Sequence, residues 1–185
     1  PEPLLFEWNY DCSKIKVLAL ICASTSDQEL HTWDTFDAFT KLDTDLKWLV
    51  SHRGQKWGKF YGDKELDLQK RFFDRFLKGD TEAFTAPPGV VIDVHSDRWD
   101  FAQLEANAWP LPGTRFDSLY PDGESSDLVT TQPAASRTSL ACGTPATPGS
   151  RLIFEHRFDT ATDLIGHGAL HLTLVSESTP TIDLF

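Results

Sequence analysis

The sequence has no methionine among its 185 residues and only three cysteines, Cys12, Cys22 and Cys142. The number of cysteines is odd and their spacing is not that of metal ligands, so we predict no metal site and leave the redox compartment open. Cys22 lies within an apolar run, where a buried free thiol is expected. No sequence feature calls for a cofactor.

Long hydrophobic runs are also missing. No segment approaches the ~20 apolar residues of a membrane-spanning helix, so no membrane span is predicted. The opening PEPLLFEWNY has neither the basic nor the apolar region of a signal peptide. The compartment therefore stays open, with the cytoplasm favoured. The absence of methionine and a start at Pro1 just before an apparent central strand suggest an internal fragment, and an end at Phe185 inside an apparent strand suggests truncation there too.

Basic residues are few. The chain has 17 lysines and arginines against 28 aspartates and glutamates, a net charge of −11 that is spread along the sequence. Such a balance argues against a nucleic-acid partner. The hydrophobic fraction of 40% is enough for a packed core, in one domain or two small ones. A homo-oligomer is compatible with this composition.

The first third of the chain predicts a β-α-β unit. The segment 15–23 (IKVLALICA) is almost continuously apolar, which is typical of a parallel strand buried on both faces. After a loop over 24–29, apolar residues at three-residue steps predict an amphipathic helix with Thr32 as its cap. The segment 46–50 (LKWLV) then predicts a second strand that ends at Ser51 and His52. Two such strands joined through a helix are expected to be parallel.

The character of the sequence changes after a second helix. Apolar spacing predicts that helix over 65–78, stopped by Gly79. Past the turn at 86–89, short segments bounded by proline, glycine and aspartate predict an antiparallel β domain. Its expected strands are 90–95, 109–112, 114–120, 152–158, 169–175 and one starting at Ile182, with a long loop over 124–150. We therefore predict two domains, residues 1–86 and 87–185.

Asp27 and His52 are the strongest candidates for chemistry. Each follows a predicted strand, the acid comes first, and a helix separates them. This is the order of the acid and base of a Ser-Asp-His triad on an α/β-hydrolase sheet. An aspartate after one strand and a histidine after the next are common in α/β proteins, so the spacing alone does not establish catalysis. No serine stands in a G-x-S-x-G context, so the nucleophile is expected outside this chain.

The other histidines are assigned structural roles. His31 is expected to cap or pack at the start of a helix, and His95 and His156 to be half-exposed strand residues. His167 and His171 are four residues apart, but the sequence supplies no third ligand for a metal.

The charged residues and the aromatic residues around His52 could each have a functional or a structural role. Arg53 and Lys56 could orient a substrate carboxylate or be solvated loop charges. The neighbouring aromatic residues would either form walls for an apolar acyl or prolyl group or pack the base of the loop; they are Trp48, Trp57, Phe60 and Tyr61.

Three long segments resemble one enzyme family. The segments DQELHTWDTFDAFTKL, LKWLVSHRGQKWGKFY and LQKRFFDRFLKGD resemble the X-Pro dipeptidyl-peptidase and cocaine esterase family, also called CocE/NonD hydrolases. Their pattern has S-D-x-x-x-H-T after one strand, K-W-L and a histidine at the next, and a helix ending F-F-D-x-F-L-K-G. APPGVVIDV, WPLP and TDLIGHGALHLTLVSE are similar, more weakly, to the family's C-terminal jelly-roll domain.

This resemblance implies a fold and an activity. It implies the C-terminal part of an α/β-hydrolase catalytic domain followed by a partial jelly-roll, with Asp27 as the triad acid and His52 as the base. It implies cleavage of X-Pro peptide or ester bonds through an acyl-enzyme, with a small ester or X-Pro peptide as substrate. Family members carry the nucleophile serine and an oxyanion-hole tyrosine in a larger N-terminal part, and neither is present here. A non-catalytic pseudo-enzyme or a β-sandwich binding module is the alternative, and the substrate-binding residues stay unassigned.

Overall fold

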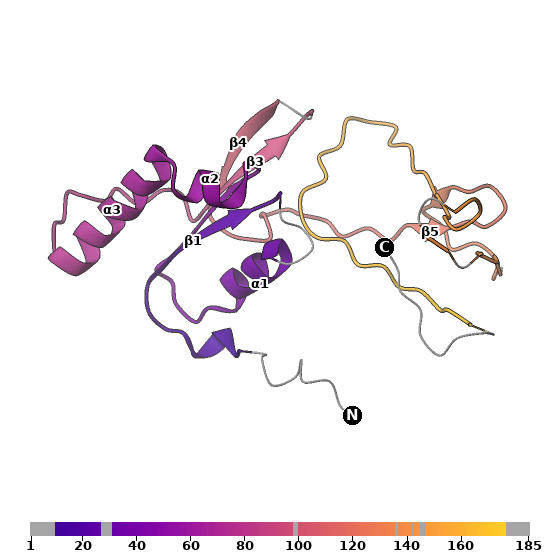
Figure 1. The fold of residues 1–185 in the computed structure, drawn as a ribbon, viewed down its shortest axis with the longest axis horizontal. Helices are drawn as coiled ribbons and strands as arrows, with labels where there is room; N and C mark the ends of the chain where they lie inside the picture. Colours follow the sequence, from indigo (N-terminus) through magenta and orange to yellow (C-terminus); the bar gives the residue numbers. More distant parts are fainter. Residues whose placement is uncertain are drawn as a thin grey trace. The chain divides into compact units, whose positions relative to one another are not determined.

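The computed structural model describes residues 10–26, 31–97, 100–135, 137–141, 143–144 and 147–176. They form two compact units, traced by colour in Figure 1. The first contains the described residues up to Thr114 together with Ile165–His167. The second contains those of Arg115–Leu164 and those from Gly168 onward.

A mixed four-stranded sheet forms the centre of the first unit. Its strands are β1 (Ala19–Ser24), β2 (Lys47–His52), β3 (Val90–His95) and β4 (Phe101–Ala106), in the order β1-β2-β3-β4. β1, β2 and β3 run parallel, and β4 pairs antiparallel with β3. The predicted parallel pair is therefore confirmed.

Helices make the parallel connections. A short 3-10 helix η2 (Cys12–Lys14) precedes β1, α1 (Trp33–Lys41) joins β1 to β2, and α2 (Lys56–Phe60) and α3 (Asp63–Lys78) join β2 to β3. Gly79 ends α3 with φ of 78°, a left-handed conformation that a side chain would strain. The predicted helix and its stop signal are confirmed.

The start of the first strand and the cap of the first helix differ from the sequence predictions. β1 begins at Ala19 rather than at residue 15, because its partner β2 begins opposite it at Lys47. Val17 is accordingly 68% exposed. Thr32 stands at the N-cap of α1 but does not cap it, since its hydroxyl donates instead to the Ser24 carbonyl oxygen at 2.6 Å.

The sheet buries apolar side chains on both faces, as the continuous apolar strands predict. One cluster joins α1 to the sheet through buried residues that alternate along the strands: Ala23, Phe39, Leu49, Val90 and Ile92. The opposite cluster joins α3 to the sheet and is aromatic: Trp48, Phe72 and Phe84. Trp48 thus packs in the core and is not a wall of a substrate pocket.

β3 corrects the assignment of the segment 90–95. The sequence placed this segment in a separate antiparallel domain, but Leu49 pairs with Val90 and Val50 with Val91 in parallel register. β3 thus extends the sheet that carries β1 and β2. The boundary between residues 86 and 87 stays a prediction, although the pairing crosses it. The uninterrupted apolar start Val90–Ile92 is the signal that favours a parallel, doubly buried strand.

The second unit contains little regular structure in its described part. A two-stranded sheet pairs β5 (Tyr120–Pro121) with β6 (Leu128–Val129), and one isolated bridge links Asp127 to Glu155. No strand is formed over 109–112, 114–119, 152–158 or 169–175, all of which the structure describes, so these strand predictions are wrong. Ile182 lies outside the described residues. No jelly-roll is present among the residues that the structure describes.

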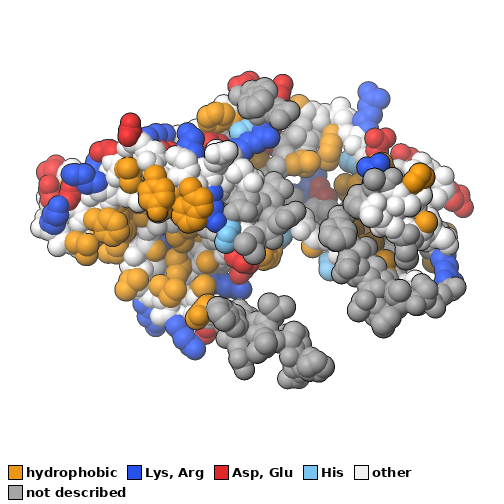
Figure 2. All heavy atoms as spheres, in the orientation of Figure 1, with side chains coloured by type: hydrophobic (Ala, Val, Ile, Leu, Met, Phe, Trp, Pro, Cys, Tyr) orange, Lys and Arg blue, Asp and Glu red, His pale blue; other side chains and the backbone are white. Residues whose placement is uncertain are grey.

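Apolar side chains also gather on the surface of the helical part of the first unit, as Figure 2 shows. The exposed ones on α2 and α3 are Trp57, Tyr61 just after α2, Leu66, Phe73 and Leu77. Among the described helices, none is long and apolar enough to cross a membrane.

Candidate active site

Ser24 and His52 end two neighbouring parallel strands. They are register partners, so both lie at the carboxyl edge of the sheet. In open parallel sheets this edge is where functional side chains collect, because the loops that follow the strands diverge there. His52 therefore lies at the edge of the sheet where functional side chains usually collect.

His52 is almost completely buried, with 8% of its surface exposed. Its Nδ1 atom is buried and has no hydrogen-bond partner among the described residues. Burial lowers the pKa of His52 below its ordinary value of 6.5, while Glu65 and the backbone of Gly54 act in the opposite direction. A neutral imidazole at neutral pH is the form that can accept a proton from a nucleophile.

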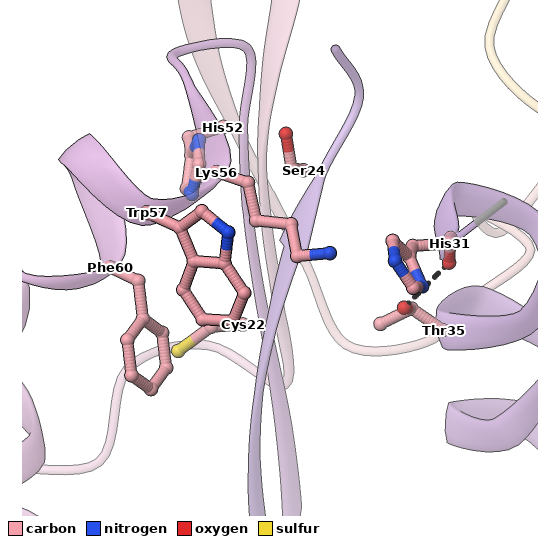
Figure 3. Close-up of a pocket in the computed structure, with 8 residues that line it drawn as sticks. All are labelled: Cys22, Ser24, His31, Thr35, His52, Lys56, Trp57 and Phe60. Atoms are coloured by element: carbon pink, nitrogen blue, oxygen red, sulfur yellow. Dashed lines mark hydrogen bonds between the residues drawn. The ribbon is translucent and has the colours of Figure 1, made fainter. Parts of the chain in front are cut away.

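A hollow of about 210 Å³ opens beside this histidine. Figure 3 shows the rings of His52, Trp57 and Phe60 on one side, with His31 and Thr35 on the other. Cys22, Ser24 and Lys56 complete its lining. This volume is smaller than the ~300–1,000 Å³ of a typical ligand pocket. The residues described here therefore form at most one side of a substrate site.

Of the aromatic candidates, Trp57 and Phe60 line the hollow. Tyr61 instead stacks on Trp57, with ring centroids 6.1 Å apart. The ammonium of Lys56 lies 5.0 Å from the centre of the Trp57 ring, and Figure 3 shows this side chain reaching across the hollow toward His31. Trp57 and Phe60 thus line the hollow, whereas Trp48 packs in the core.

Cys22 lies on the same face of β1 as Ser24, two residues away. Its thiol is free, as predicted, but Cys22 is half-buried rather than buried. Burial raises the pKa of this thiol, and the nearby Glu65 carboxylate raises it further. A thiol held in its neutral form is a poor nucleophile, so Cys22 is a wall of the hollow rather than its reactive group.

The loops after β1 and β2 are joined by hydrogen bonds that the sequence analysis did not foresee. The Ser24 hydroxyl lies 2.9 Å from the Ser26 hydroxyl, and the Ser26 hydroxyl donates to the Gly54 carbonyl oxygen at 3.0 Å. The Thr25 amide donates to the His52 carbonyl oxygen at 2.9 Å. Ser24 is therefore engaged with Ser26 and Gly54, and no hydrogen bond links it to the His52 ring.

Asp27, the predicted triad acid, lies outside the described residues. In the sequence it comes three residues after Ser24, the register partner of His52. His31 lies two residues before the start of α1, and its carbonyl oxygen accepts from the Thr35 hydroxyl at 2.7 Å. His31 thus lies at the start of the helix, exposed and in the lining of the hollow, and its expected capping or packing role stays a prediction.

The remaining charged and histidine candidates lie elsewhere. The Arg53 guanidinium lies 3.3 Å from Nδ1 of His95, so it turns toward β3. His156 approaches the Leu128 carbonyl oxygen at 2.7 Å, and His167 packs edge-on against Trp33. Among the described residues no group of three histidine, cysteine or acidic side chains could hold a metal ion.

Comparisons with known proteins give a likeness at the level of structure. No protein-family model matches the sequence, and no curated protein is significantly similar to it. Two crystal structures of a CocE/NonD family hydrolase from Staphylococcus aureus match with a TM-score of 0.61 and 32% sequence identity. The chain is similar to a CocE/NonD hydrolase. The match covers 65% of this chain and 22% of the hydrolase chain.

The likeness supports the α/β part of the predicted fold. The first unit has a mixed sheet with helices on both faces, and its sequence is 32% identical to that of the hydrolase over the matched part. Both findings agree with the family resemblance seen in the sequence. The match covers less than a quarter of the hydrolase chain, so it supports a shared fold and a likeness to the family and no more.

Proposed function

We propose that this chain supplies the acid and the base of a serine-hydrolase triad of the CocE/NonD type, Asp27 and His52. The observation that carries the proposal is the buried His52 ring at the carboxyl edge of a parallel sheet, with an unpaired Nδ1 atom. The likeness to a CocE/NonD hydrolase supports it. The nucleophile has to come from outside these 185 residues, because none of their serines has the G-x-S-x-G context.

The Nδ1 atom is the reason to place a carboxylate beside His52. A buried polar atom without a partner costs about 1–3 kcal/mol, so such atoms are almost always paired in native proteins. The carboxylate of Asp27 is close in sequence: three residues of chain span at most about 10 Å from Ser24. A carboxylate that accepts the Nδ1 proton fixes the tautomer that leaves Nε2 free to act as a base.

The reaction follows from these roles. The serine hydroxyl attacks the carbonyl carbon of an ester or X-Pro amide while Nε2 of His52 takes its proton. The protonated imidazole, stabilised by Asp27, then gives the proton to the leaving alcohol or amine. Water repeats the sequence on the acyl-enzyme, with His52 again acting as base, and releases the acid.

One observation favours a second candidate, a non-catalytic protein. The chain itself has no nucleophile elbow, and the serine beside His52 has its hydroxyl engaged with Ser26 and Gly54. A pseudo-enzyme or a binding module would retain the sheet and the buried histidine without turnover.

The experiment compares hydrolysis by the complete protein that contains these residues with hydrolysis by its His52→Gln variant. The substrates are p-nitrophenyl acetate and Ala-Pro-p-nitroanilide. We expect His52→Gln to lower kcat/KM by at least about 10⁴-fold, as loss of a triad base does. His171→Gln, an exposed histidine of the second unit, is the matched control and should retain full activity.

Labelling with a fluorophosphonate probe separates the two candidate functions. The complete protein should be labelled on one serine outside the 185 residues, and the 185-residue chain should remain unlabelled. An inactive and unlabelled complete protein would support the binding module. Full activity of His52→Gln would contradict the triad assignment.

A further inference from the structure

Three consecutive residues at the end of β1 contact the backbone around His52. Ser24, Thr25 and Ser26 follow one another at the end of the strand, and each side-chain hydroxyl has a partner in or near the loop after β2. Thr25 uses both its amide, at 2.9 Å, and its hydroxyl, at 3.3 Å, to donate to the His52 carbonyl oxygen. The backbone of His52 is therefore held from the β1 side.

The serine hydroxyls form a connected chain that ends on Gly54. The Ser26 amide donates to the Ser24 oxygen at 3.3 Å, and the two serine hydroxyls lie 2.9 Å apart. The Gly54 carbonyl oxygen lies 3.0 Å from the Ser26 hydroxyl and 3.3 Å from the Ser24 hydroxyl. This chain holds the backbone two residues after His52.

Gly54 also lies close to α2. A Cβ atom at this position would lie 2.4 Å from Cγ of Lys59, so the loop packs directly on the side chain of α2. Ser24 is 8% exposed, which shields its bonds from competition with water. The carbonyl oxygens of residues 52 and 54 therefore both accept hydrogen bonds from the β1 side, one at His52 itself and one two residues after it.

We propose that Ser24, Thr25 and Ser26 are positioning residues for His52. Their hydroxyl groups set the place of its ring at the carboxyl edge of the sheet and take no part in proton transfer. This inference rests on the proposed function, in which His52 is the base. A displacement of a catalytic group by about 1 Å can lower a rate by about 10²-fold, so loss of this anchorage should lower kcat.

The test uses a nearly isosteric pair at Ser26 in the complete protein. Ser26→Thr keeps the hydroxyl and Ser26→Val replaces it by a methyl group, while both introduce the same branching at Cβ. We expect Ser26→Val to lower kcat for p-nitrophenyl acetate by about 10- to 100-fold with little change in KM, and Ser26→Thr to stay within about twofold of the parent. Equal kcat for the two variants would overturn the inference.

A second comparison separates positioning from a general loss of structure. In a His52→Gln background, Ser26→Val should cause no further loss of the residual activity, because the base that it positions is gone. A further loss of the same size would overturn the inference in favour of a purely structural role. Ser13→Ala removes an exposed hydroxyl bonded to Asp11 and should leave kcat unchanged.

The outcomes also separate this inference from the proposed function. If His52→Gln keeps its activity, the triad assignment fails and the positioning role fails with it. If His52→Gln is inactive but Ser26→Val is fully active, the positioning inference alone fails. Should Ser26→Val not fold, Ser24→Ala tests the same chain of hydrogen bonds through the buried hydroxyl, with the same expected loss of kcat.

Discussion

The two units of the chain contain similar apolar sequence patterns but bury them differently. In the first unit, continuous apolar strands pair with one another and are covered by helices on both faces. In the second, the described part of GALHLTLV has leucines at every second position, as a strand would, yet Leu170, Leu172 and Leu174 are all exposed. Every buried residue among those that the structure describes lies in the first unit.

The difference shows that an apolar pattern predicts an element only where a partner is available. β1 pairs with β2, which follows it after a single helix and is therefore close along the chain. The segment 169–175 has no strand partner among the described residues. Period-two alternation therefore indicates which face a strand would bury, whereas long-range pairing decides whether the strand forms.

The largest expected contrast is in stability. Leu49→Ala removes a fully buried side chain from the first unit and should lower the free energy of unfolding by about 2–5 kcal/mol. Leu172→Ala, at a position that is 49% exposed in the second unit, should change it by less than about 0.5 kcal/mol. Urea unfolding followed by tryptophan fluorescence measures both values. Equal losses would mean that the second unit has a core of its own.

A smaller contrast concerns pH. Burial lowers the pKa of His52 in the folded chain below its ordinary value of 6.5. At a pH between the folded-state pKa and 6.5, the unfolded chain therefore binds a proton that the folded chain does not. Stability should therefore fall as the pH drops from 7.5 through 6.5 to 5.5. Thermal unfolding measures this slope, which His52→Gln should reduce and His171→Gln, in the second unit, should leave intact. An unchanged slope in His52→Gln would show that His52 does not contribute.

Much of the first unit is predictable from local patterns. The second helix has an apolar stripe and a glycine stop, and α3 ends at Lys78 with Gly79 in the left-handed conformation. The strand before His52 is predicted within about one residue at its start. The first strand is predicted too long, because apolar residues at 15–18 match a strand pattern that has no partner beyond Lys47.

The candidate site is predictable only in part. A histidine directly after an apolar strand indicates the carboxyl edge of a sheet, and His52 lies there. The hydroxyl contacts of Ser24 and Ser26 with Gly54 depend on how two loops approach each other across the sheet, which no local pattern encodes. The run Ser-Thr-Ser at the end of one strand and the glycine two residues after His52 are the signals that could have suggested these contacts.

The most direct test of the acid–base pair is the titration of His52 in the 185-residue chain by NMR, with the resonance assigned through His52→Gln. If Asp27 is the partner of Nδ1, its carboxylate stabilises the protonated ring, and Asp27→Asn should lower the pKa of His52 further below 6.5. Asp45→Asn, an exposed aspartate just before β2, should leave the titration unchanged. A His52 titration that is the same in Asp27→Asn as in the parent chain would contradict the pair, and with it the account of this chain as half of a catalytic triad.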